Sequence, residues 1–146
     1  MNPKKLGAVR PRVLVVDDDG TMRATCCALL ENDFEVESAQ SGAEAMALLQ
    51  GTRFDGLCTD HKMPGMPGLE LVVEATKLAN PPSPVVGTAY SESALRDRTA
   101  ETPPFLLLVK PYNPLALIEL VRRAQELGSI RRELVPSVES EPPSTD

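Results

Sequence analysis

Tryptophan is absent from the 146-residue sequence, which has only two tyrosines, three phenylalanines and one histidine. A core built on aromatic rings is therefore excluded, and the buried side chains must come from the aliphatic residues that dominate the 42% apolar content. Aliphatic residues of this kind are typical of parallel sheets that helices cover on both faces. Because His61 is the only histidine, a metal site built from several imidazole groups is also excluded.

The sequence also lacks an excess of positive charge and a long apolar run. Its formal net charge of −6 argues against sequence-independent binding to nucleic acid or to an anionic membrane, because both attract basic surfaces. There is no apolar stretch long enough to span a membrane, and the basic segment 1–11 has no signal-peptide core. We therefore expect a cytoplasmic protein with neither nucleic acid nor membrane as partner. The cysteines, Cys26, Cys27 and Cys58, match no metal-site spacing and are interpreted as small apolar residues.

Five short apolar runs alternate with segments of helical periodicity, which indicates repeated strand-helix units in one domain over residues 12–128. The predicted strands cover residues 12–16, 35–39, 56–59, 85–87 and 105–109. The predicted helices cover residues 21–31, 69–79, 93–100 and 114–128, and one more begins at a capping box formed by Ser41 and Glu44. Residues 1–11 are expected to form a basic tail, and residues 129–146 a disordered tail rich in Pro, Ser and Glu. The fold class is thus α/β, a doubly wound parallel sheet of five strands with five helices.

Polar side chains that can carry chemistry directly follow the predicted strands. They are Asp17 and Asp18 after the first strand, Asp60 after the third, Thr88 after the fourth and Lys110 after the fifth. Open parallel sheets bind ligands at the carboxyl ends of their strands, so these side chains should meet at one rim. Two carboxylates about 4 Å apart repel by roughly 4 kcal/mol at an effective dielectric near 20, and a divalent cation removes this conflict. Mg²⁺ fits this oxygen-rich set best, with Lys110 and Thr88 left to contact a phosphoryl group.

Four motifs in order, VLVVDD, TDHKMPGMPGLEL, GTAYSES and VKPY, resemble the response-regulator receiver family, particularly its single-domain members. The resemblance covers residues 12–128 and implies a flavodoxin-like receiver fold. It also implies self-catalysed, Mg²⁺-dependent phosphorylation, with a histidine kinase, a phosphotransfer protein or acetyl phosphate as donor. The protein would then signal to a protein partner by changing shape, rather than act as an enzyme on other substrates. The sequence names neither the kinase nor the target. A weak homodimer also remains an open alternative.

The resemblance implies specific metal ligands. Asp60 is the expected phosphoacceptor and, with Asp18, a direct ligand of Mg²⁺. Asp17 is expected to act mainly through a bound water, and the backbone carbonyl of Lys62 to supply a further ligand. Asp19, next in the chain, is interpreted as a solvated turn residue.

The resemblance also implies how the phosphoryl group is held. Thr88 is the expected switch hydroxyl and Lys110 the family's lysine, followed by a cis bond to Pro111. Backbone amides of Ala89 and His61 are expected to contact the phosphoryl group, while the His61 side chain is expected to lie exposed in its loop.

Two departures from the family and one hypothesis follow from the sequence. Leu107 stands where the family usually has Tyr or Phe, so an aromatic switch is not expected, and residues 101–104 replace a Gly-Ala turn. The side chains of Lys62 and Tyr90 flank the expected phosphoryl position, where we expect them to restrict the attacking water and slow dephosphorylation.

Two other functions fit the sequence less well. A pseudo-receiver scaffold that works without phosphorylation usually lacks an acceptor, an acidic partner or the lysine, and none is missing here. A phosphatase with an aspartate nucleophile wants a second acid two residues later, where Lys62 stands.

Overall fold

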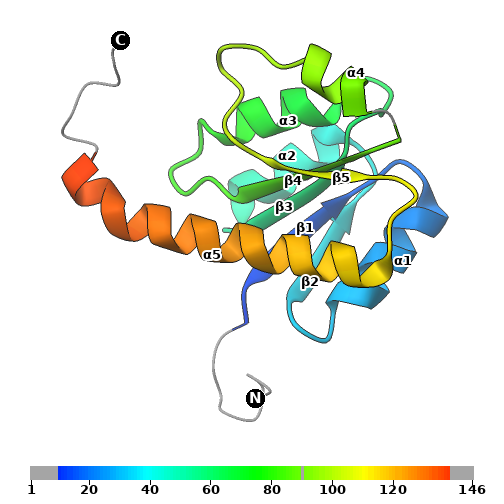
Figure 1. Ribbon diagram of the computed structural model, residues 1–146, viewed down its shortest axis with the longest axis horizontal. Coiled ribbons are helices and arrows are strands. Elements are labelled where there is room, and N and C mark those ends of the chain that lie inside the picture. Colours follow the sequence, from blue (N-terminus) through cyan, green and yellow to red (C-terminus); the bar gives the residue numbers. More distant parts are fainter. Residues whose placement is uncertain (1–9, 90, 139–146) are drawn as a thin grey trace.

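The computed structural model describes residues 10–89 and 91–138, and of residues 91–93 and 129–138 it describes the backbone alone. Five parallel strands form one sheet in the order β2-β1-β3-β4-β5 (Figure 1). The strands are β1 (Arg12–Val16), β2 (Glu35–Ala39), β3 (Gly56–Asp60), β4 (Ser83–Thr88) and β5 (Leu106–Val109). This order is that of a doubly wound, flavodoxin-like sheet, so the predicted fold class is confirmed.

Helices cover both faces of the sheet (Figure 1). They are α1 (Gly20–Leu30), α2 (Gly42–Gly51), α3 (Gly68–Ala75), α4 (Ser91–Arg96) and α5 (Pro114–Val138). Because side chains alternate along a strand, Leu14 and Val16 pack in the core under α2 and α3, whereas Val13 and Val15 pack in the core under α1 and α5. Every strand of the sheet centre is thus buried on both sides, as the aliphatic composition predicts.

Side-chain caps explain where three helices begin. The Asp19 carboxylate accepts hydrogen bonds from the backbone N–H groups of Thr21 and Met22, so the predicted turn residue is also the exposed N-cap of α1. Ser41 accepts from the Glu44 N–H at 3.1 Å, which confirms the predicted cap of α2. The Asn113 side chain accepts from the Leu115 N–H at 2.7 Å, which places Pro114 at the first helical position as predicted.

The elements around α3 and α4 differ in length from the prediction. β4 begins at Ser83 rather than Val85, because the Ser83 N–H already donates to the Asp55 carbonyl at 2.9 Å. The helix α3 ends at Ala75, and α4 ends at Arg96 instead of residue 100. After α4 the chain turns at Thr99, whose N–H donates to the Thr102 hydroxyl at 2.9 Å.

The last helix, α5, continues to Val138, so the helix end expected at Gly128 is wrong, whereas the disorder expected of residues 129–146 stays a prediction. A glycine costs a helix interior only about 1 kcal/mol relative to alanine, which is too little to end a long helix by itself. Residues 1–9 and 139–146 of the expected tails lie outside the described residues. Among the described residues, no helix combines the length and the apolar character needed to cross a membrane.

Candidate functional site

The strand register brings the predicted site residues to one edge of the sheet. Asp60, the last residue of β3, pairs with Gly87 of β4, and Thr88 pairs with Val109 of β5. Asp17 directly follows β1, whose last residue pairs with Thr59 next to Asp60. The carboxyl ends of four strands therefore carry the polar side chains, at the edge where parallel sheets bind ligands.

Three carboxylates meet at this edge. One oxygen from each of Asp17, Asp18 and Asp60 lies within 4.8 Å of the others. Asp17 is buried with 4% exposure, Asp60 is half-buried and Asp18 is exposed, so the cluster runs from the sheet interior to the surface. A hard cation that prefers oxygen ligands could enter from the Asp18 side and be held by carboxylates on its inner side.

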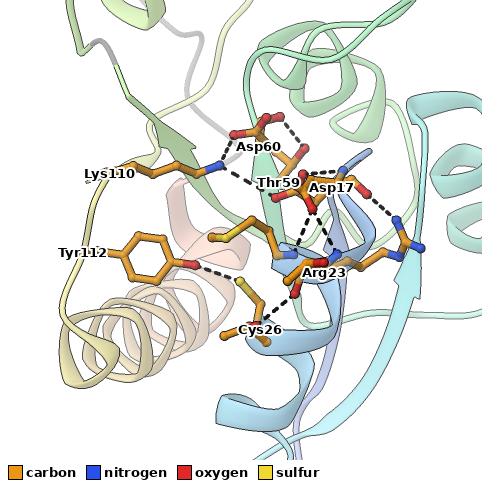
Figure 2. Close-up of polar contacts among 11 residues, drawn as sticks. Asp17, Arg23, Cys26, Thr59, Asp60, Lys110 and Tyr112 are labelled. Carbon is orange, nitrogen blue, oxygen red and sulfur yellow. Dashed lines mark hydrogen bonds and ion pairs between the residues drawn. The ribbon is translucent and has the colours of Figure 1, made fainter.

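Lys110 supplies the positive charge of the site (Figure 2). Its Nζ donates a hydrogen bond to Oδ1 of Asp60 at 2.6 Å and lies 3.7 Å from Oδ2 of Asp17. Burial acts to lower the pKa of Lys110, but the hydrogen bond to Asp60 and the charges of Asp60 and Asp17 outweigh burial and raise the pKa. Lys110 therefore remains an ammonium group over the physiological pH range.

Asp17 is the carboxylate of the cluster whose negative charge is least favoured by its surroundings. Burial raises the pKa of this carboxyl group above its ordinary value. A hydrogen bond of 2.9 Å from the Asp19 N–H and the charge of Lys110 act in the opposite direction, while the charges of Asp60 and Asp18 raise the pKa further. One lysine thus leaves the three carboxylates under-neutralised, which is the electrostatic condition that favours binding of a cation.

Thr88 is buried with 2% exposure, and its carbonyl accepts a hydrogen bond from the Lys110 N–H at 2.8 Å. Ala89, the next residue, is exposed, and so is Lys62 in the loop after β3. The peptide bond between Lys110 and Pro111 is cis, as the resemblance implied. Tyr90, expected to flank the phosphoryl group, lies outside the described residues.

His61 departs from the prediction. The side chain expected to lie exposed is only 2% exposed, and its ring Nε2 lies 2.8 Å from Oδ2 of Asp97. The His61 backbone N–H donates to the Gly87 carbonyl at 2.8 Å, which extends the β3–β4 ladder. Because this amide already donates to Gly87, it is not available to a phosphoryl group, and the expected contact between the two is wrong. The partner Asp97 is distant in sequence, and no local pattern pointed to it.

The start of α3 packs directly on the end of β3. Gly68 N–H donates to the His61 carbonyl at 2.8 Å, and a Cβ atom at position 68 would collide with the Asp60 carbonyl oxygen. Only glycine allows the helix to begin this close to the backbone of Asp60.

Sequence reasoning missed two contacts that hold the site in place (Figure 2). Arg23 on α1 donates from Nη1 to the Asp17 carbonyl at 2.7 Å. The Tyr112 hydroxyl and the Cys26 thiol are 2.9 Å apart, and burial raises the pKa of both groups, so both remain protonated. The helical spacing of Arg23 and Cys26 on α1 places them on adjacent turns, but their partners follow only from the folded sheet. All three cysteines are unpaired, and Cys26 and Cys58 are buried, which agrees with their interpretation as small apolar residues.

A groove of about 400 Å³ lies next to Lys110, between α1 and the start of α5. Its lining is mostly apolar and consists of Met22, Thr25, Leu29, Ala89, Lys110, Pro111, Tyr112 and Pro114. The groove places an apolar surface at the edge of the acidic site.

Comparisons with known proteins agree with this geometry. The family model for the response regulator receiver domain matches residues 13–122. The transcriptional regulatory protein PrrA of Mycobacterium leprae is 37% identical over 124 residues, which cover 83% of this chain and 51% of that protein. The hydrogenase transcriptional regulatory protein HoxA of Bradyrhizobium diazoefficiens is 28% identical over 129 residues, covering 86% of this chain and 26% of that protein. The chain therefore spans about a quarter to a half of the length of these relatives.

Solved structures give the same result. Chemotaxis response regulator CheY4 of Vibrio cholerae has a TM-score of 0.72 and 29% identity, covering 80% of this chain and 99% of CheY4. A CheY-like receiver domain protein from Methanospirillum hungatei has a TM-score of 0.72 and 27% identity, covering 84% of this chain and 98% of that one. The sheet order, the acidic edge with its lysine and the family match over most of the sequence lead to one conclusion: the chain belongs to the response regulator receiver family of two-component signalling.

Proposed function

We propose that this receiver domain accepts a phosphoryl group on Asp60 in a Mg²⁺-dependent reaction and signals to a protein partner by changing shape. The observation that carries the proposal is the position of Lys110, whose Nζ lies 2.6 Å from the Asp60 carboxylate at the edge of the acidic cluster. A carboxylate placed between a fixed cation and further carboxylates is suited to phosphoryl transfer, which depends mostly on positioning and on neutralising charge.

The residues present fit a magnesium ion. The candidate ligands are oxygen atoms alone, and the three carboxylates lie within 4.8 Å of one another with Lys110 as the only cation in contact among the described residues. Asp18 and Asp60 would hold the ion directly together with the Lys62 carbonyl, and Asp17 through a water molecule. Bound Mg²⁺ would neutralise charge on the transferred phosphoryl group as the new bond forms.

The transfer itself needs one nucleophile and one leaving group. A carboxylate oxygen of Asp60 forms a bond to phosphorus while the bond between phosphorus and the donor's imidazole nitrogen breaks, and the nitrogen keeps the electron pair. Lys110 then donates to an oxygen of the transferred group, and the Thr88 hydroxyl and the Ala89 N–H to the others. Attack of water on phosphorus then breaks the bond between phosphorus and the Asp60 oxygen, which releases inorganic phosphate and returns the free Asp60 carboxylate.

The donor is proposed to be a histidine kinase or a phosphotransfer protein that docks beside the site. The apolar groove next to Lys110 supports this, because a helix of the donor can cover Met22, Leu29 and Pro114 while its histidine reaches Asp60. The relatives PrrA and HoxA are transcriptional regulatory proteins by name, and the target of this chain is proposed only as a protein.

Acetyl phosphate with Mg²⁺ followed by intact-mass measurement tests the proposal. The wild type should gain one phosphoryl group, and Asp60→Asn none. Asp19→Asn is the matched control, because asparagine keeps the α1 cap while the same charge is removed nearby, and this variant should be phosphorylated normally. An unmodified wild type would favour the phosphorylation-independent scaffold, and a modified Asp60→Asn would place the acceptor elsewhere.

A further inference from the structure

His61, the residue after the phosphoacceptor, is held at four points. Its N–H donates to Gly87, its carbonyl accepts from Gly68, and its ring contacts the Leu69 N–H and Asp97. These partners belong to β4, to the start of α3 and to the segment directly after α4. The backbone next to Asp60 is therefore connected to three neighbouring elements through one residue.

The hydrogen bonds of the His61 ring determine which of its two nitrogens carries the proton. The Leu69 N–H donates to Nδ1 at 3.4 Å, so Nδ1 acts as an acceptor and the proton resides on Nε2. Nε2 then donates to Oδ2 of Asp97 at 2.8 Å, as a neutral ring bonded to a carboxylate. The bond has a direction and a short length, so it responds to small displacements of either partner.

Asp97 lies in a groove whose other charged side chains are carboxylates. Its side chain is 52% exposed, on a groove of about 380 Å³ that also carries Glu70, Glu74 and Glu101. None of the described side chains that line this groove is a lysine or an arginine. The bond to His61 therefore joins the segment directly after α4 to the residue that follows Asp60.

This family commonly has an aromatic side chain in the fifth strand that follows phosphorylation, but here Leu107 holds that position and pairs with Val86. We propose that His61 is a positioning residue that replaces this lever: its bond to Asp97 holds the end of α4 in the unphosphorylated arrangement. The inference rests on the proposed phosphorylation of Asp60. A phosphoryl group on Asp60 and a cation on the Lys62 carbonyl act on the chain on both sides of His61, and a rotation there moves Nε2 away from Asp97.

The test compares the affinity of the wild type and of variants for beryllium fluoride with Mg²⁺, a phosphoryl analogue. If the bond exists only in the unliganded state, Asp97→Ala binds the analogue about tenfold more tightly. The reason is that losing one hydrogen bond to a charged group changes an equilibrium constant by about one order of magnitude. Asp97→Asn keeps an acceptor oxygen and stays closer to the wild type. Glu101→Ala, which removes a charge from the same groove without touching His61, leaves the affinity unchanged.

If the bond is purely structural and present in both states, its removal lowers the stability of the protein without changing this affinity. Equal affinities of the wild type and Asp97→Ala therefore overturn the inference, as does weaker binding by Asp97→Ala. If the wild type itself does not bind the analogue, both the proposed function and the inference fail. If the wild type binds the analogue and Asp97→Ala binds it equally well, only the inference fails.

A spectroscopic measurement provides a second readout. Because the chain has one histidine, the ring nitrogen signals in ¹⁵N NMR belong to His61 alone. The Nε2–H signal should be protected from exchange in the free wild type, and should shift and lose protection when the analogue is added. In Asp97→Ala the signal should be unprotected from the start. A protected Nε2–H that does not respond to the analogue overturns the inference.

Discussion

The Tyr112 hydroxyl lies 2.9 Å from the Cys26 sulfur, so one hydrogen bond joins α1 to the segment that follows Lys110. Lys110 and Tyr112 belong to the same short connection between β5 and α5. The contact therefore fixes the position from which the lysine reaches Asp60.

Tyr112→Phe removes the hydroxyl and keeps the ring. We expect the free energy of unfolding to fall by about 1 kcal/mol, the typical net value of one hydrogen bond. Urea denaturation measures this change. In a Cys26→Ala background the same substitution should have almost no effect, and an undiminished loss there would show that the hydroxyl stabilises the fold through something other than Cys26.

Lys110→Met removes the cation that contacts Asp60 and Asp17. Phosphorylation by acetyl phosphate should slow by about a hundredfold, because a preorganised donor to the transferred group is lost. Initial rates followed by intact mass provide the measurement. Lys77→Met, which removes an exposed lysine paired with Glu74, is the control and should react at the wild-type rate. Equal rates for both variants would contradict the role of Lys110.

Magnesium should stabilise the folded domain. At a Mg²⁺ concentration a hundred times Kd, linkage predicts a gain of about 2.7 kcal/mol in the free energy of unfolding. Thermal unfolding with Mg²⁺ and with a chelator measures the gain. Asp18→Asn should lose most of it, whereas Asp19→Asn should keep it, and a full response by Asp18→Asn would remove this residue from the ligand set.

Stability should depend on pH through Asp17 when no cation is bound. Its pKa is raised in the folded state, chiefly by burial. At a pH between its unfolded and folded pKa values the folded protein therefore binds more protons, and stability falls as the pH rises through that window. In metal-free buffer, Asp17→Asn should be more stable than the wild type at neutral pH, with a smaller difference in acid. Denaturation at several pH values checks this, and a difference that grows in acid would contradict it.

Much of the fold follows from local patterns. The alternation of apolar runs with helical periods predicts the five strand-helix units, and the side chains of Ser41 and Asn113 predict two helix starts that their hydrogen bonds confirm. Helix ends are harder to predict, because they depend on turns such as that between Thr99 and Thr102 and on how far α5 extends beyond the sheet.

The chemical groups of the site could also be predicted, because position after a strand places them at one edge in a parallel sheet. The contacts that hold them could not. The buried His61 ring contacts Asp97, 36 residues away in the chain, and Tyr112 bonds Cys26, 86 residues away. Such pairs appear only when the strand order is known.

The close approach of Gly68 to the Asp60 carbonyl restricts how this receiver can vary. Any larger residue at position 68 must push either α3 outward or the Asp60 backbone inward, and in both cases the distance between α3 and the Asp60 carboxylate changes. The absence of a side chain at Gly68 thus sets the distance between the start of α3 and Asp60. A substitution at this uncharged position can therefore displace the Asp60 carboxylate although it replaces none of the charged side chains of the site.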